Sequence, residues 1–129
     1  MDSVRRLVDW NDLGPHRFLE EAPSAVMLVD PAGKIVWANR AAVTLFGYAR
    51  PEIVGRSVEM LLPQDRRSDH GEYLARWFRH PHSRPMEADL GIQGRNKNGD
   101  LLDLDIQLSP IETDKGIMAC AWVRERGSK

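Results

Sequence analysis

The sequence predicts an α+β domain in which two strands, a helical middle segment and three further strands follow one another along the chain. Three observations predict this order. A short apolar run followed by turn residues opens the core, apolar residues recur at helical spacing in the middle, and apolar and polar residues alternate in the last third. A chain of 129 residues is the size of one ordinary domain, so we expect one hydrophobic core.

Two strands are predicted at the start of the core. Residues 25–29 form a short apolar run, and residues 35–38 form a second one. The intervening Asp-Pro-Ala-Gly-Lys, residues 30–34, has turn chemistry. We therefore expect the two runs to pair as a hairpin.

The helical middle is predicted to begin at Asn39, which is a good N-cap for a helix over residues 40–46. Short helical turns are predicted between residues 51 and 62. From residue 68 to residue 78 the apolar side chains recur with a period near 3.6, which predicts a longer helix that carries His70.

Beyond residue 84 the period changes to two. The apolar positions are even-numbered, namely Met86, Ala88, Leu90 and Ile92 in one stretch and Leu102, Leu104, Ile106 and Leu108 in the next. The alternation predicts two half-buried antiparallel strands that turn at Asn98-Gly99, and residues 117–123 supply a third strand. We expect the even-numbered side chains to wall an interior cavity, and Asp103 and Asp105 to point outward.

The two ends of the chain are expected to lie outside the core. We expect residues 1–17 to be an N-terminal amphipathic helix or linker, residues 18–125 the domain, and residues 126–129 a tail. Val4, Leu7 and Val8 form a short apolar face that has no obvious partner within the core. We therefore expect these three residues to be dimer contacts.

Charge and motif content argue against several functions. A formal net charge of -1 supplies no field that would gather nucleic acid or an anionic membrane surface. No apolar run approaches the roughly 18 residues that span a bilayer, so we expect a cytoplasmic chain without membrane contact. The single cysteine, Cys120, lies in an apolar run and is expected to be a small buried hydrophobe. Neither a nucleophile elbow nor a phosphate-binding glycine loop occurs, so we do not expect an enzyme.

Several linked motifs resemble the PAS family. They are Val29-Asp30-Pro31-Ala32-Gly33-Lys34-Ile35-Val36, Asn39-Arg40-Ala41-Ala42, Leu45-Phe46-Gly47-Tyr48 and Glu52-Ile53-Val54-Gly55-Arg56. The resemblance implies a five-stranded antiparallel sheet that encloses a small cavity together with the helical middle. It also implies a sensor and dimerisation module of a signalling protein, with a homodimer, a small-molecule ligand and an output domain outside this chain. The family's last motif, Asp-Ile-Thr, is absent, because Glu125-Arg126-Gly127 follows Arg124.

Within this family, the stretch from Pro63 to Phe78 is similar to haem-binding oxygen sensors of the FixL type. The run Arg67-Ser68-Asp69-His70, with Tyr73 and Arg76 after it, carries the similarity. It implies that His70 would be the axial iron ligand and that Arg76 would pair with a haem propionate.

Other positions of the haem-binding pattern are matched only in part. Arg84 stands where that group has a second histidine that contacts a propionate, and Leu90 stands where it has a gas-responsive arginine. Ile106 and Leu108 fall where the group has apolar residues on the distal side of the haem.

Three alternatives remain open from the sequence. His70 can cap or buttress its helix without any cofactor. A non-covalent flavin could lie against Trp37 or Trp77, whereas covalent attachment needs a cysteine on the helix after the first hairpin, which has none. The chain can also be a ligand-free protein-interaction module, with Trp122 as an anchor on the outer face of the sheet.

Overall fold

The computed structural model of the chain describes residues 18–86 and 92–126. Its strands are β1 Ala25–Val29, β2 Ile35–Ala38, β3 Arg84–Met86, β4 Ile92–Arg95, β5 Leu101–Thr113 and β6 Gly116–Glu125. Its helices are α3 Arg40–Phe46, α4 Arg50–Ile53 and α5 Arg67–Arg79, with the 3-10 turns η1 Val58–Leu61 and η2 Gln64–Arg66. Residues 18–20 are also helical, and we call them the N-terminal turn.

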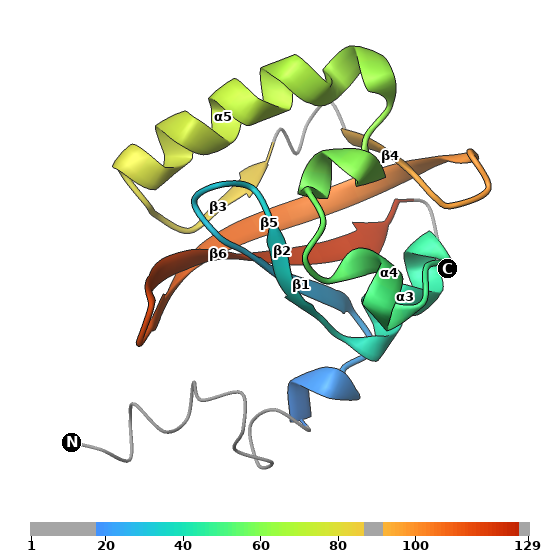
Figure 1. Ribbon diagram of the computed structural model, residues 1–129, viewed down its shortest axis with the longest axis horizontal. Coiled ribbons are helices and arrows are strands. Elements are labelled where there is room, and N and C mark those ends of the chain that lie inside the picture. Colours follow the sequence, from blue (N-terminus) through green and yellow to red (C-terminus); the bar gives the residue numbers. More distant parts are fainter. Residues whose placement is uncertain (1–17, 87–91, 127–129) are drawn as a thin grey trace.

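One curved antiparallel sheet forms the body of the domain (Figure 1). Its strand order is β2-β1-β6-β5-β3, and β4 also pairs with β5. The last strand therefore lies between the first strand and the longest one. Helices between the early and the late strands pack against the sheet, which confirms the predicted α+β fold class.

The first hairpin and the helix after it form where the sequence predicts them. The Asp30 carboxylate accepts hydrogen bonds from the backbone N–H groups of Ala32 and Lys34, at 3.0 and 2.9 Å, and so closes the turn between β1 and β2. Gly47 ends α3 in the left-handed conformation, at φ 78°.

The predicted strand from Met86 to Ile92 is instead two short strands, β3 and β4, on either side of residues 87–91. Met86 is opposite Ile106, and Ile92 is opposite Leu104. Six positions thus separate Met86 from Ile92, whereas only two positions separate their partners Ile106 and Leu104 on β5. The pairing register of β3 therefore cannot continue unchanged into β4. Both strands lie along the same edge of β5, so the sheet has the five strand positions that were predicted, with one of them broken.

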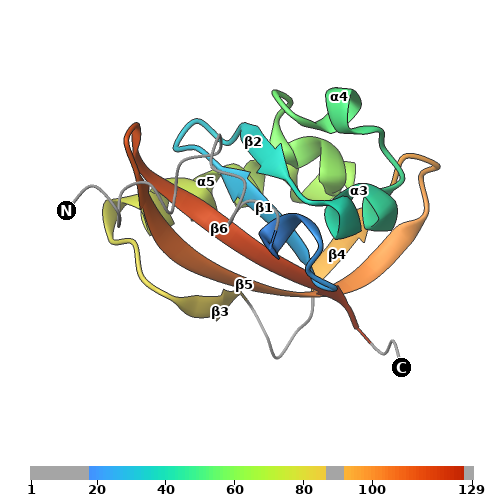
Figure 2. The same ribbon diagram turned by 90° about the horizontal axis from the view of Figure 1, so that it is seen from below.

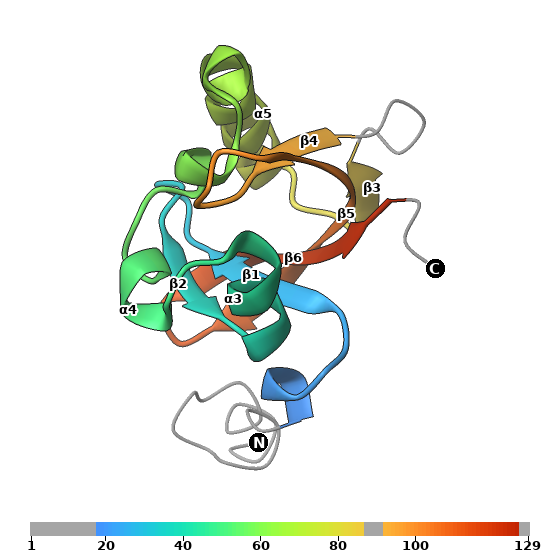
Figure 3. The ribbon, with the colours of Figure 1, turned by 90° about the vertical axis from the view of Figure 1, so that its right-hand side faces the viewer.

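The sheet buries apolar side chains on both faces. On the inner face, Leu104 and Leu108 of β5 enter the main core, together with side chains of α3 and α5. The even-numbered positions from 102 to 108 thus point inward as the alternation predicts, and Asp103 is exposed. Figure 3 shows α5 and the N-terminal turn on opposite sides of the sheet.

The outer face carries a second, smaller group of buried residues, which we call the outer cluster: Val26, Leu28, Trp37 and Cys120. Leu28 is opposite Cys120, so β1 and β6 bring these side chains together. Leu19 of the N-terminal turn packs against this cluster from outside the sheet, and Figure 2 shows that turn in front of β1. The burial of Cys120 confirms the expectation from its apolar run.

Candidate functional site

Helix α5 directs one face toward the inner face of the sheet. Leu74 and Trp77 are 7% and 3% exposed and belong to the main core. His70 is four residues before Leu74 and seven before Trp77, so all three lie on the same side of the helix. His70 is half-buried, in keeping with that position.

His70 has an unusual environment for a histidine. Burial lowers the pKa of its imidazole from 6.5 to about 4, so the ring is neutral at pH 7. Its Nδ1 atom is buried and accepts or donates no hydrogen bond within the described part of the chain. A buried polar atom without a partner costs about 1–3 kcal/mol, so a ligand that supplied a partner here would be stabilised. A neutral imidazole is also the form that binds a metal ion.

Helix α5 lies close to η1 near its start and is hydrogen-bonded to the following loop near its end. A Cβ atom on Gly71 would lie 3.2 Å from Oε2 of Glu59, so the glycine allows η1 to pack closely against the helix beside His70. At the other end, Nε1 of Trp77 donates a hydrogen bond to the backbone oxygen of His82, at 2.9 Å. This bond ties the helix to the loop that leads into β3.

The other predicted site residues are only partly gathered around His70. Leu108 is buried in the main core, and Ile106 is half-buried against it, so both border the interior that α5 covers. Arg76 is exposed, and six residues along a helix place it on a different side from His70. The backbone of Arg84 pairs with that of Leu108. The side chain of Arg84, and Leu90 as a whole, lie outside the described residues, as do Val4, Leu7 and Val8.

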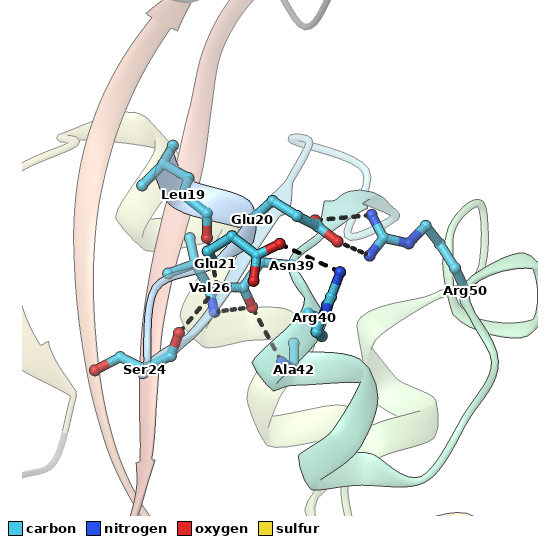
Figure 4. Close-up of polar contacts among 9 residues, drawn as sticks. All are labelled: Leu19, Glu20, Glu21, Ser24, Val26, Asn39, Arg40, Ala42 and Arg50. Atoms are coloured by element: carbon cyan, nitrogen blue, oxygen red, sulfur yellow. Dashed lines mark hydrogen bonds and ion pairs between the residues drawn. The ribbon is translucent and has the colours of Figure 1, made fainter. Parts of the chain in front are cut away.

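A second polar site joins the N-terminal turn to the sheet and to α3 (Figure 4). Asn39 is fully buried, and its side chain makes four hydrogen bonds. Its Oδ1 accepts from the backbone N–H groups of Val26 and Ala42, at 2.9 and 3.0 Å. Its Nδ2 donates to the backbone oxygens of Leu19 and Ser24, both at 2.9 Å. Asn39 therefore connects the start of α3 with the N-terminal turn and the start of β1, which lie 13 to 20 positions earlier.

Two ion pairs reinforce this connection. Arg50 of α4 makes a two-pronged pair with the carboxylate of Glu20, and the Nη1–Oε1 distance is 3.0 Å. Arg40 of α3 forms a second ion pair with Glu21, and the distance between Nη2 and Oε2 is 3.2 Å. Sequence reasoning identified Asn39 only as a helix cap, although its amide carries two donors beyond the capping oxygen. Nothing in the sequence indicates the pairing of Glu20 with Arg50, thirty positions away.

Comparison with curated proteins finds similarity to parts of two sensor proteins. The chain is 27% identical over 107 residues to the oxygen sensor protein DosP of Escherichia coli, and the alignment covers 83% of this chain and 13% of DosP. It is also 27% identical over 109 residues to the sensor protein FixL of Bradyrhizobium diazoefficiens, which covers 83% of this chain and 21% of FixL. The chain thus spans only a small part of the length of these relatives.

Solved structures show the same fold. The PAS domain of an HTR-like protein from Haloarcula marismortui superposes with a TM-score of 0.75 at 16% identity, covering 97% of this chain and 99% of that one. The PAS domain of nitrogen regulation protein NR(II) from Vibrio parahaemolyticus gives a TM-score of 0.69 at 23% identity, covering 87% of this chain and 97% of that one. A family model for the PAS fold matches residues 15–126. The chain therefore belongs to the PAS family, as its linked motifs indicate.

Proposed function

We propose that this chain is the sensor and dimerisation module of a larger cytoplasmic signal-transduction protein, and not an enzyme. In this proposal a small molecule binds between α5 and the inner face of the sheet. The observation that carries the proposal is the neutral, half-buried His70 with an unpartnered nitrogen on the core-facing side of α5. The names of two relatives, an oxygen sensor protein and a sensor protein, support a sensory role.

A ligand at His70 would act by favouring one arrangement of α5 over another. It would satisfy the buried Nδ1 atom and would contact the apolar side chains of Leu74 and Leu108. A ligand shifts a conformational equilibrium only through its different affinities for the two states. Because α5 lies close to η1 at Gly71 and is hydrogen-bonded through Trp77 to the loop before β3, a shift of the helix would change its packing at both places. The output domain that reads this change would lie outside this chain.

Native mass spectrometry of the purified protein tests the sensory proposal without assuming a ligand class. We expect a retained small molecule in the wild-type chain and its loss in His70→Ala. His82→Ala is the matched control, because the His82 side chain is exposed and the hydrogen bond from Trp77 uses the backbone oxygen, which the substitution keeps. Retention in His70→Ala, or no retained mass in any preparation, would contradict ligand sensing through His70. The second outcome would favour a ligand-free interaction module, with the half-exposed Trp122 as its anchor.

Haem is a specific candidate for this ligand, and the unpartnered nitrogen of His70 favours it. When bound, haem would supply an iron centre with an open position for a gas, and His70 would hold the iron. Leu108 and Ile106 would supply the apolar surroundings, and the exposed Arg76 could reach only a propionate at the protein surface. Purification from a haem-supplemented host should then give a Soret band that changes in His70→Ala. An absent or unchanged band rules out this assignment.

Dimerisation is the second half of the proposal, with Val4, Leu7 and Val8 as contacts. Among the described residues, Phe18 next to this segment is 79% exposed, and a large apolar side chain in that position also suits a dimer contact. Solution scattering should report a dimer that is lost when residues 1–14 are removed. A strict monomer at high concentration, with or without those residues, would contradict dimerisation.

A further inference from the structure

The turn between β4 and β5 carries a chemically reactive pair of residues, Asn98 and Gly99 (Figure 1). Asn98 is exposed, and its side-chain amide makes no hydrogen bond within the described part of the chain. Gly99 lies at φ 90°, a conformation that glycine adopts without strain, and it has no Cβ atom to shield its backbone nitrogen. A free amide thus precedes an unhindered backbone nitrogen.

We propose that Asn98 is a site of spontaneous deamidation. In the first step the backbone nitrogen of Gly99 gives its proton to hydroxide and attacks Cγ of Asn98. The new C–N bond closes a succinimide ring, the bond from Cγ to the side-chain nitrogen breaks, and ammonia leaves with a proton from water. A second water molecule then opens the ring at either carbonyl and gives aspartate or isoaspartate at position 98. Overall one water is consumed and one ammonia is released, so the reaction needs no oxidant or reductant.

Arg95 supplies a positive charge beside the reacting atoms. A Cβ atom placed on Gly99 would lie 3.6 Å from Nη2 of Arg95 and 3.8 Å from Nε. Deprotonation of the Gly99 nitrogen and its attack on Cγ both create negative charge in this turn, and a neighbouring guanidinium stabilises that charge. Asn98 is also the only asparagine of the chain that precedes a glycine. The sequence and the charge of the turn therefore favour the same position.

The backbone hydrogen bonds of the turn distinguish Asn98 from its neighbour Asn96. The N–H group of Gly99 donates to the backbone oxygen of Asn96 at 3.0 Å, so this bond must open before the nitrogen attacks. Lys97 and Asn98 are exposed, so the opening is a local fluctuation that leaves the core intact. The nitrogen that would attack Asn96 belongs to Lys97, which carries a side chain and donates to the backbone oxygen of Phe46 at 2.9 Å. Asn98 therefore reacts much faster than Asn96.

Deamidation alters the contacts that join this turn to α4. Nζ of Lys97 lies 2.7 Å from Oε2 of Glu52. A carboxylate at position 98 adds negative charge next to this ion pair and competes with Glu52 for the ammonium group. Isoaspartate also adds a methylene group to the main chain, which lengthens the turn that the bond from Gly99 to Asn96 closes. The modification goes beyond the proposed sensory function and does not depend on it.

Peptide mapping by mass spectrometry tests this inference on the full-length chain after incubation at mildly alkaline pH. We expect a gain of about 1 Da at position 98, because a hydroxyl group replaces an amino group. The gain at Asn98 should be at least about tenfold faster than at Asn96, where the attacking nitrogen belongs to a residue with a Cβ atom. The rate should rise about tenfold for each pH unit, because the deprotonated nitrogen is the nucleophile. No gain at position 98, or equal gains at both positions, would overturn the inference.

Two variants test the chemistry and the contribution of the charge. Asn98→Gln keeps the amide but moves it one methylene further from the backbone, so the mass gain at this position should disappear during the same incubation. A gain that persisted there would contradict attack by the Gly99 nitrogen. Arg95→Gln should slow the reaction about threefold to fivefold, because it removes a unit charge near the reacting atoms. An unchanged rate in Arg95→Gln would overturn the effect assigned to the guanidinium.

Discussion

Replacement of Asn39 should strongly destabilise the domain, because its side chain makes four buried or partly buried hydrogen bonds. Asn39→Ala removes all four side-chain hydrogen bonds and leaves the N–H groups of Val26 and Ala42 buried without those partners. A typical hydrogen bond contributes about 1 kcal/mol, and a buried donor left unsatisfied costs about 1–3 kcal/mol. Two buried donors and two partly buried acceptors together predict a loss of about 3–5 kcal/mol. That loss is a large fraction of the roughly 5–15 kcal/mol that stabilises a typical domain.

Urea denaturation measures this loss, and a second cap provides the control. Ser57 caps η1 through an exposed hydrogen bond of 3.2 Å to the backbone N–H of Glu59. Ser57→Ala should therefore cost at most about 1 kcal/mol, because water can replace the lost partner. Asn39→Asp keeps both accepted bonds but turns a carboxylate oxygen toward the carbonyls of Leu19 and Ser24, so it should also be strongly destabilising near pH 7. If Asn39→Ala cost no more than Ser57→Ala, the reasoning from the hydrogen-bond network would be refuted.

Three further predictions concern the core and the N-terminal turn. Burial lowers the pKa of His70 from 6.5 to about 4, so the unfolded chain takes up a proton first as the pH falls. As the pH falls from 6.5 to about 4, the free energy of unfolding of the ligand-free wild type, measured in urea, should drop by up to about 3 kcal/mol more than that of His70→Gln. Equal losses in both proteins would contradict the burial of this ring. Gly94→Ala should destabilise by about 1–3 kcal/mol in urea, since its Cβ would approach Cδ1 of Leu104 to 2.6 Å; an unchanged midpoint would show that β4 can shift away. A double-mutant cycle with Glu20→Gln and Arg50→Met should give a coupling of about 1 kcal/mol, and additive effects would show that the pair contributes nothing.

Local chemistry made most of the fold predictable from the sequence. The turn after β1, the cap at Asn39 and the glycine after α3 each satisfy backbone groups within a few residues, so their signals are local. The alternation in β5 also follows directly from burial on one face. The break between β3 and β4 was not predictable, because a period of two persists through residues 86–92 whether or not they pair with β5.

The helix that carries His70 was predictable from the sequence, but the electrostatics of this histidine were not. The period of 3.6 predicts a helix over residues 68–78, and α5 spans Arg67–Arg79. The lowered pKa and the unpartnered nitrogen depend on what surrounds the ring in three dimensions, which no local pattern encodes. The link between Asn39 and Leu19 was out of reach for the same reason, since it joins positions twenty residues apart.

The central position of β6 beside β1 determines how the domain would respond to tension. Ala25, at the start of β1, is opposite Val123, near the finish of β6, so the polypeptide arrives at and departs from the sheet on the same side. The bonds of an antiparallel ladder run perpendicular to its strands. A pull applied through the flanking polypeptide would therefore unzip this pair one bond at a time, and the domain would yield to small forces at β1 while the α5 side stayed intact.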